Sequence, residues 1–311
     1  MPADAQIPAD QPISTRQRAR RIAKRALMLL WVVAALFVFA SAFTLTLRGG
    51  DVGAAPLAQS AGAVLVFVVL ISFACEYVDS SIGMGYGTTL TPMLLLLGFA
   101  PAVVVPAVLM QELVSGSVNA FSHHRLGNAD LRLRGRALRM ALLLGGCGLI
   151  GGAVAARVAV ALPADWVKLV AGIIVAAMGL VVAAGGRFRL RFSWARAGVL
   201  GLVAAINKGF MGGGYGPIVS SGQIVTGIRA REAVAITSLS ECITCVGALT
   251  GYMTGGTALP WGMAAGLIAG GALASVLGAA TVRVIGEERL RWAVAAGCLL
   301  LGGLTLVKAL L

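Results

Sequence analysis

The sequence contains little charge. Only 12% of its 311 residues are Asp, Glu, Lys or Arg, whereas 59% are hydrophobic, and the mean hydropathy is +0.91. Soluble domains are about half apolar and about a quarter charged. The composition therefore excludes a soluble globular protein and indicates a membrane protein, with no stretch long enough to form a soluble catalytic domain.

The sequence is also poor in the residues that build catalytic and metal sites. It has two histidines, His123 and His124, and five cysteines, all of them in apolar segments. Two adjacent histidines supply too few ligands for a metal, and an odd set of cysteines in apolar segments argues against a disulfide framework. Cys242 and Cys245 have C-x-x-C spacing, but no second pair accompanies them. We therefore expect no cofactor, no metal site and no enzymatic activity.

Acidic residues are few compared with basic ones. The 12 Asp and Glu face 25 Lys and Arg, which gives a net charge of +13. Such an excess can indicate a nucleic-acid partner, but the arginines lie in short clusters between apolar runs, where the positive-inside rule expects them. We interpret them as topology signals and expect no nucleic-acid partner. The clusters are 125–136, 186–196, the pair Arg229 and Arg231, and 283–291.

Long apolar runs dominate the rest of the chain, and a spanning helix needs roughly 20 apolar residues. A basic tail over 1–25 precedes a run at 26–48, which resembles a signal peptide cleaved near Ala40-Ser41-Ala42 or an extra transmembrane helix. Its length favours the helix. Ten further helical segments are predicted at roughly 61–82, 88–99, 101–122, 137–160, 165–185, 196–210, 216–227, 231–252, 262–283 and 290–310.

One glycine-rich motif occurs twice. Gly85-Tyr86-Gly87 and Gly214-Tyr215-Gly216 lie 129 positions apart (214 − 85), and the same interval separates Glu112 from Glu241. This shared register predicts an internal duplication, with one transmembrane repeat at 61–185 and a second at 196–311. Each repeat holds five segments, of which the second is too short to span comfortably, so it either spans or re-enters.

The basic clusters predict how the repeats are oriented. If the first two segments of each repeat make an even number of crossings, the basic loops and the N-terminal tail all lie on one side. A single crossing would put 125–136 on the other side. The first arrangement gives each repeat an odd number of crossings. We therefore expect an all-α polytopic protein of the cell inner membrane, with two inverted-topology repeats, Gly-broken helices and a cytoplasmic N-terminus.

The glycine breaks also predict a binding site. A broken helix is tolerated within a membrane only where it is buried or lines a wet cavity. The hydroxylated residues and the proline after each break are typical of a helix N-terminus, which attracts anions. Inverted repeats with broken helices are the architecture of secondary transporters. The predicted substrate-binding residues are Gly85, Tyr86, Gly87, Thr88, Thr89, Gly214, Tyr215, Gly216, Ser220, Ser221 and Lys208.

Five of the charged residues within the apolar segments are predicted to lie at membrane depth: Glu76, Asp79, Glu112, Lys208 and Glu241. Such residues are costly in a membrane and line pathways, pair with one another or relay protons. Lys208 either complements an anion or pairs with Glu241, Asp79 or Glu76. A buried carboxyl tends towards its neutral form and can bind a proton. The four acids are therefore predicted to serve proton coupling or to line the pathway, and a structural role stays open for Glu112 and Glu241.

Two other function classes remain. Gly-Tyr-Gly invites comparison with the potassium filter, in which four TVGYG loops present carbonyls to the ion. Here there are two copies, preceded by IGM and GGG, so a channel is disfavoured. An intramembrane enzyme is the least favoured alternative, because Ser117 has no histidine at membrane depth to activate it.

The segments around the two breaks resemble the sulfite exporter TauE/SafE family. The residues that carry the resemblance are SSIGMGYGTTLTPMLLLLGFAPAVVVPAV, NKGFMGGGYGPIVSSGQIVTGIRAREAVAITSLSE and the loop RLGNADLRL, and it covers about residues 61–310. The resemblance implies an inner-membrane permease for small oxyanions such as sulfite and sulfonates. Tyr86 and Tyr215 replace a glycine that is frequent in the family, which implies a narrowed or re-aimed site. The anion, the direction, the coupling ion and assembly as a homo-oligomer are left open.

Overall fold

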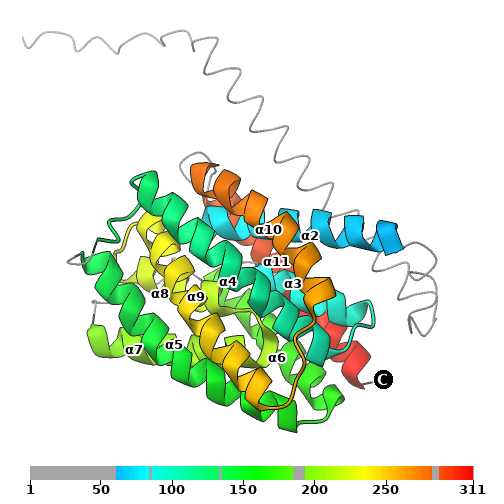
Figure 1. The fold of residues 1–311 in the computed structure, drawn as a ribbon. Coiled ribbons are helices and arrows are strands. Elements are labelled where there is room, and N and C mark those ends of the chain that lie inside the picture. Colours follow the sequence, from blue (N-terminus) through cyan, green and yellow to red (C-terminus); the bar gives the residue numbers. More distant parts are fainter. Residues whose placement is uncertain (1–60, 84–85, 133–134, 185–192, 282–286, 311) are drawn as a thin grey trace, which may run out of the picture.

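The computed structural model describes residues 61–83, 86–132, 135–184, 193–281 and 287–310, and this part of the chain is helical without strands. The basic tail, the run at 26–48 and Gly85 lie outside the described residues. Figure 1 shows the bundle. Its helices are α2 (Ala61–Ile82), α3 (Tyr86–Leu96), α4 (Pro101–Arg125), α5 (Arg136–Ala161), α6 (Ala164–Ala184), α7 (Trp194–Met211), α8 (Tyr215–Val225), α9 (Ala230–Thr254), α10 (Trp261–Thr281) and α11 (Glu287–Leu310).

The ten predicted segments are confirmed as these ten helices, with ends that differ by a few residues. The main difference is at the breaks, because α3 begins at Tyr86 and α8 at Tyr215. The two tyrosines are therefore the first residues of helices and do not belong to the interruptions themselves. Each short helix has 11 residues and is about 16 Å long, so neither crosses a hydrocarbon core of about 30 Å alone.

The interval of 129 positions recurs in the helix boundaries. Both ends of α8 follow the ends of α3 by this interval, and both ends of α9 follow those of α4. The residues that end the preceding helices also correspond, because Gly83 and Gly212 have φ of 74° and 70°. This left-handed conformation favours glycine, and it turns the chain out of α2 and α7.

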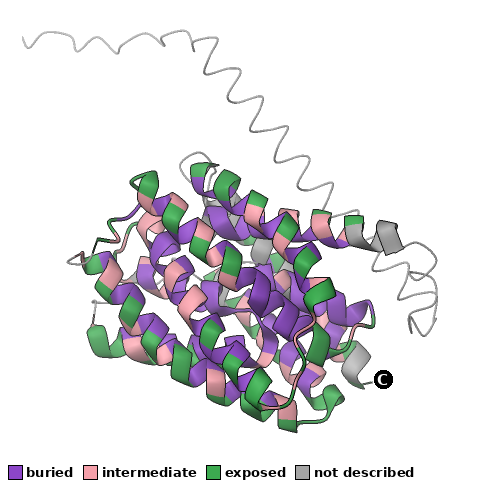
Figure 2. Cartoon of the chain, viewed as in Figure 1, coloured by how far each residue is buried: buried purple, intermediate pink, exposed green. Residues whose placement is uncertain are grey.

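The helices of the two sequence halves are interleaved. Helix α5 packs against α7 and α9, whereas α10 packs against α2 and α4, so each packs mainly on helices of the other half. Helices α4 and α9 form the centre of the bundle. In their most apolar stretches 67% and 72% of the residues are buried, compared with 44% in α5 and 50% in α10. Figure 2 shows the buried residues concentrated in the middle of the bundle.

The central helices α4 and α9 run in opposite directions. Asn119 of α4 donates a hydrogen bond to Ser238 of α9 over 2.7 Å, while the carbonyl of Leu113, earlier in α4, accepts from Cys242, later in α9. Residue numbers therefore fall along one helix as they rise along the other. This antiparallel crossing brings the middle of α4 against the middle of α9.

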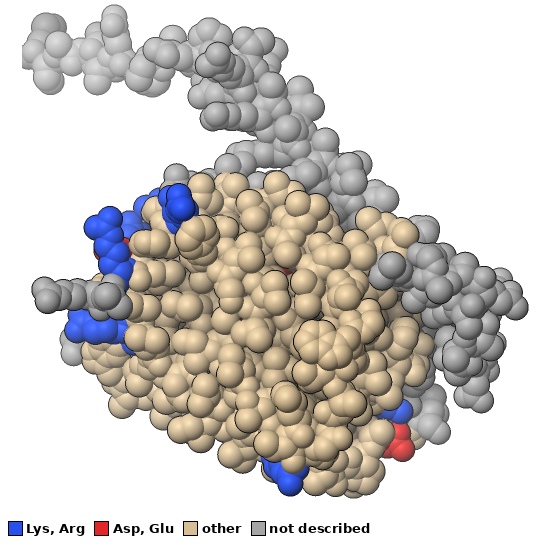
Figure 3. Space-filling model, viewed as in Figure 1, with Lys and Arg blue, Asp and Glu red and all other residues tan. Residues whose placement is uncertain are grey.

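The outer surface is apolar. Large side chains such as Leu70, Ile150 and Leu273 are more than 60% exposed, and the face in Figure 3 is largely uncharged. Helices α4, α5, α9 and α10 are long and apolar enough to cross a membrane. Since contiguous exposed apolar surface is rare in soluble monomers, these helices indicate a multi-pass membrane protein.

Exposed tryptophans lie near helix starts. Trp194 and Trp261 are the first residues of α7 and α10, and Trp166 and Trp292 lie near the starts of α6 and α11. All four side chains are more than 40% exposed. Tryptophan is enriched where a membrane meets water, so this placement is typical of an interfacial aromatic belt.

The starts of α5 and α9 lie at the same end of the molecule. Arg136, which begins α5, and Arg229, which precedes α9, line one small cavity together with Glu232. The start of α5 and the segment 227–229 before α9 are therefore close in space. In Figure 3 most Lys and Arg on the visible face gather at one end.

Candidate functional site

The start of α3 and the segment that leads into α8 are in backbone contact. A Cβ atom on Gly87 would lie 2.6 Å from the carbonyl oxygen of Gly212, and one on Gly213 would lie 2.6 Å from the backbone nitrogen of Thr88. Heavy atoms that are not bonded do not approach so closely, so the backbone leaves no room for a side chain at either position. Two interruptions far apart in sequence therefore meet at one place.

The start of α8 has no side-chain cap. Its N-cap residue is Gly214, with φ of 80°, and no side chain accepts a hydrogen bond from the first turn. The first N–H groups of a helix have no partner within the helix. Pro92, expected in the first turn of the corresponding helix, is instead the seventh residue of α3. Because proline has no N–H group, the carbonyl of Thr88 lacks its usual helical donor.

Two buried polar side chains near this contact have no hydrogen-bond partner. They are the hydroxyl of Thr88 and the amide of Asn207, for which neither the nitrogen nor the oxygen is paired. The Asn207 amide lies directly against Gly214. An unpaired buried polar group costs about 1–3 kcal/mol, so groups of this kind call for an explanation. Asn207 was not predicted, and its only signal in the sequence is an amide within an apolar segment.

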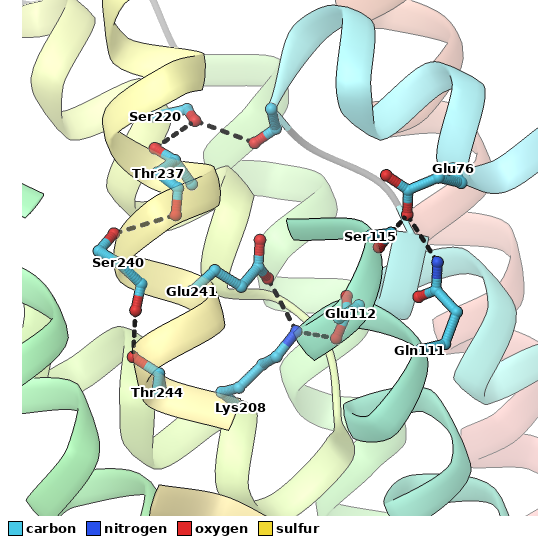
Figure 4. Close-up of polar contacts among 11 residues, drawn as sticks. Glu76, Gln111, Glu112, Ser115, Lys208, Ser220, Thr237, Ser240, Glu241 and Thr244 are labelled. Carbon is cyan, nitrogen blue, oxygen red and sulfur yellow. Dashed lines mark hydrogen bonds and ion pairs between the residues drawn. The ribbon is translucent and has the colours of Figure 1, made fainter. Parts of the chain in front are cut away.

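Ser220 and Tyr86, both predicted to bind substrate, hold the protein together in this structure. Ser220 Oγ lies 2.9 Å from the carbonyl oxygen of Gly83 and 2.9 Å from Thr237 Oγ1 (Figure 4). Because it has one proton, it can donate to Gly83 while accepting from Thr237. The Tyr86 hydroxyl, 1% exposed, lies 2.9 Å from Ser72 Oγ. Ser220 thus fixes the end of α2 to α8, and Tyr86 fixes α3 to α2.

The remaining predicted residues lie around the helix starts. Tyr215 is fully buried in an apolar cluster. Gly216 and Ser221 are buried in α8, and Thr89 is half-buried in α3. The tyrosine rings therefore pack inside the bundle.

Lys208 forms a buried ion-pair triad with two glutamates. Its ammonium, 0% exposed, donates to the carboxylate of Glu112 and, over 2.8 Å, to Oε1 of Glu241 (Figure 4). Of the predicted partners, Glu241 is the one found, and Glu112 joins it. The triad connects α7 with the centres of α4 and α9. Both carboxylates face the only cation that the structure describes in this part of the interior, so its charge is already balanced by the protein.

Glu76 is surrounded by neutral donors. One of its carboxylate oxygens accepts hydrogen bonds from Ser80 over 2.7 Å and from Ser275 over 3.0 Å, and the other accepts from Gln111 over 2.9 Å and from Ser115 over 3.0 Å. Figure 4 shows Glu76 with Gln111 and Ser115. The carboxylate is 2% exposed with four donors and no cation partner among the described residues.

Asp79 differs from the other three acids. It is 9% exposed, and its carboxyl group makes no hydrogen bond or ion pair within the described part of the chain. It lies in the last turn of α2, where its backbone carbonyl accepts from the amide of Gly83. The charged groups that act on it are Glu76, Glu112, Glu241 and Lys208. Asp79 is thus a buried acid without a partner, beside the break.

The histidines do not form a catalytic pair with Ser117. His123 is fully buried: its Nδ1 lies 2.9 Å from the amide nitrogen of Asn128 and its Nε2 lies 3.1 Å from the carbonyl of Ser80. An imidazole that accepts at Nδ1 carries its proton on Nε2 and donates there. Ser117 donates to the carbonyl of Leu113. No nucleophile–base pair is present between these residues.

Comparison with known proteins gives a family. The model of the sulfite exporter TauE/SafE family matches residues 68–305. The chain is also similar to a protein of Bacillus subtilis (strain 168) named "Probable membrane transporter protein YtnM", with 27% identity over 223 residues, which cover 68% of this chain and 72% of that protein. No solved structure matches. Because the family model spans most of the sequence, including both helix starts and the buried residues Glu76, Asp79, Glu112, Lys208 and Glu241, the chain belongs to the sulfite exporter TauE/SafE family.

Proposed function

We propose that the protein is a secondary transporter that carries a small sulfur oxyanion, sulfite or an organosulfonate, across the cell inner membrane. Membership of the sulfite exporter family supports the substrate class and an exporting direction. The B. subtilis relative carries the name of a membrane transporter. In this proposal the basic end of the bundle and the N-terminus face the cytoplasm, as the positive-inside rule requires.

The observation that carries the proposal is the meeting of the two helix starts. Helix N-termini present unpaired N–H groups and a favourable dipole to an anion. The start of α8 has no side-chain cap, and the unpaired hydroxyl of Thr88 and amide of Asn207 lie beside it. A sulfur oxyanion has several acceptor oxygens and would give these donors their missing partners.

Two inverted repeats would allow this site to open to either side. Helices α4 and α9 have corresponding boundaries and run in opposite directions, which supports an inverted duplication. Reciprocal contacts support it further, because Gly83 lies against Val234 of the second half and Gly212 lies against Val105 of the first. The two contacts correspond to each other, because Gly212 follows Gly83 and Val234 follows Val105 by the same 129 positions. Transporters with such repeats work by rocking one part against the other around a fixed site.

The charge of the anion would be met by the helix starts. Lys208 was predicted to complement it, but its ammonium is paired with Glu112 and Glu241. In the proposed transporter the triad joins the halves, and a proton accompanies transport because the acids around the site outnumber the cation.

Binding of anions to the purified protein tests the proposal. A ligand that binds only the folded state raises its stability, by about 2.7 kcal/mol at a hundred times its Kd. Thermal unfolding is measured with sulfite, sulfate, thiosulfate, sulfoacetate, taurine, acetate and chloride. We expect selective stabilisation by a sulfur oxyanion and saturable flux of that anion in proteoliposomes. Equal responses to all seven solutes, or none, would contradict the proposed substrate class.

A further inference from the structure

We propose that Asp79 binds a proton whenever an anion occupies the site, so that proton and anion are carried together in the same direction. This inference rests on the proposed function, because it assumes an anion at the starts of α3 and α8. It adds two things to that function: the residue that carries the proton, and the direction in which the proton moves relative to the anion.

The buried charges do not balance. Four carboxyl groups, those of Glu76, Asp79, Glu112 and Glu241, and one ammonium, that of Lys208, are buried in the described interior. If all four are ionised, the described interior carries three negative charges more than Lys208 balances. An anion entering there adds to this excess, and like charges repel strongly where water is scarce. A proton taken up together with the anion removes the extra charge.

The four acids differ in the contacts that a proton would cost them. Protonation of Glu112 or Glu241 would weaken a buried contact to Lys208. Lys208 would stay paired with the other glutamate, but one of its two buried ion pairs would be replaced by a weaker contact. Glu112 and Glu241 are therefore less suited to carry the proton than an acid that would lose no contact.

Glu76 is equally constrained. Each of its oxygens already accepts from two donors, Ser80 and Ser275 on one side and Gln111 and Ser115 on the other. A proton on Oε2 would face Gln111 Nε2, which can only donate, and a proton on Oε1 would require Ser80 or Ser275 to accept instead of donate. Protonation of Glu76 therefore requires its hydrogen bonds to rearrange.

Asp79 can take a proton without the loss of any interaction. Its carboxyl has no partner, and three like charges act on it, those of Glu76, Glu112 and Glu241, against the one opposite charge of Lys208. A proton would relieve this repulsion.

The other titratable groups around α2 do not change this. Helix α3 contributes Tyr86, bonded to Ser72, and α4 contributes His123, bonded to Ser80 and Asn128. Helix α10 contributes no titratable side chain, and Cys75 of α2 is half-buried.

A second observation links Asp79 to the ligand. Asn207 is 5% exposed, has both amide atoms unpaired, and points at the start of α8. It precedes Lys208, whose counterpart in the first repeat is Asp79. Asp79 and Asn207 therefore lie near the ends of α2 and α7, the two helices that lead into the breaks. The carboxyl, once protonated, becomes a donor that an anion can accept from.

Proton uptake on anion binding tests the proposal. Titration calorimetry in two buffers with different ionisation enthalpies gives the number of protons taken up per anion. Methanesulfonate is the main probe, because it stays ionised throughout, and sulfite is the second, with its own titration subtracted. At pH values at which Asp79 is ionised in the free protein, we expect about one proton per anion for the wild type and an affinity that falls about tenfold per pH unit. At lower pH, where Asp79 already holds its proton, uptake should vanish and the affinity should be constant.

Asp79→Asn carries a permanent neutral donor, so it should bind methanesulfonate without proton uptake and with no dependence on pH. Asp130→Asn, which changes an exposed aspartate, should behave as the wild type. Asp79→Glu keeps a carboxyl group and should retain the proton uptake. This variant separates the loss of the carboxyl group from a general effect of substitution at position 79.

Three results would overturn the assignment. They are anion binding without proton uptake in the wild type, uptake that persists in Asp79→Asn, and uptake that is lost in Glu241→Gln although Asp79 is intact. An affinity that follows sodium instead of pH would also overturn it. If the wild type binds neither probe at any pH, the proposed function fails and the inference fails with it.

Discussion

Gly87 and Gly213 touch through their backbones, at the point where the start of α3 meets the segment that leads into α8. They lie in opposite halves of the sequence and on the two predicted breaks. A contact this close cannot be produced by flexible side chains, so it fixes the relative position of the two helix starts. The candidate site is defined by this relationship more than by any single side chain.

The contact predicts that even one methyl group is harmful there. Gly87→Ala and Gly213→Ala should each force backbone segments apart, at a cost of about 1–3 kcal/mol, and should weaken anion binding. The measurement is thermal unfolding in detergent with and without the stabilising anion. Gly146→Ala is the matched control, because a Cβ atom there meets nothing within 4 Å. It should be neutral or slightly stabilising, and equal effects at all three positions would contradict the proposed contact.

The triad predicts a large effect from the loss of its cation. Lys208→Met leaves Glu112 and Glu241 buried beside each other without compensation, so stability should fall by about 3–5 kcal/mol. Adding Glu112→Gln and Glu241→Gln to the same chain should restore much of it, since the buried charges are then gone.

The control for Lys208 is Lys168→Met. Lys168 pairs with the exposed Asp165, and a pair of this kind is worth about 0–1 kcal/mol. Thermal unfolding of all variants separates the cases. If the triple variant is no more stable than Lys208→Met, the loss of stability in Lys208→Met does not come from the uncompensated charges of Glu112 and Glu241.

One buried hydrogen bond recurs at corresponding positions of the two halves, and its contribution to stability can be measured. Tyr252 donates to the carbonyl of Gly209 over 3.1 Å, and its counterpart His123 contacts Ser80, the counterpart of Gly209. Tyr252→Phe should destabilise the protein by about 1 kcal/mol or somewhat more, because a buried carbonyl loses its donor.

Tyr77→Phe gives the comparison for Tyr252→Phe. The hydroxyl of Tyr77 is buried without a partner, so its removal should be neutral or stabilising. The two substitutions remove the same atom, and thermal unfolding compares them directly. A larger loss at Tyr77 than at Tyr252 would contradict the hydrogen-bond assignment.

The orientation of the bundle can be tested with single cysteines. Asp130→Cys lies in the basic loop between α4 and α5, and Ala258→Cys lies beyond the far end of α9. In intact cells a membrane-impermeant thiol reagent should label position 258 and should reach position 130 only after the membrane is opened, because the basic end faces the cytoplasm. Labelling of both positions from the same side would refute the antiparallel placement of these loops.

Much of the helical architecture was predictable from the sequence. Apolar runs and the shared interval between Glu112 and Glu241 were enough to locate ten helices. The predicted starts of α3 and α8 are wrong by two residues and one residue, because a glycine-rich motif predicts an interruption where the helix has already begun. In the structure Gly87 lies inside the first turn, where its role is to allow close approach of the backbone.

The partners of the charged residues could not be predicted in the same way. Glu76 accepts from Ser275, which is 199 positions away on α10, and no pattern in the sequence connects them. Lys208 had three candidate partners on different helices, and only packing selects among them. The lack of a hydrogen-bond partner for the side chains of Asn207 and Asp79 is likewise a property of the folded chain. It depends on whether any neighbouring helix places a donor or an acceptor within reach.

Binding of sulfite to Thr88→Val tests the central claim most directly. Valine has nearly the shape of threonine, and the hydroxyl it replaces is buried without a partner, so the variant should be at least as stable as the wild type. A hydrogen bond to a charged ligand is worth about 1.5–3 kcal/mol, so sulfite should bind about 10- to 100-fold more weakly. Thr250→Val, on the exposed side of α9, should bind as the wild type does. Unchanged binding in a stable Thr88→Val protein would contradict an anion site at the start of α3.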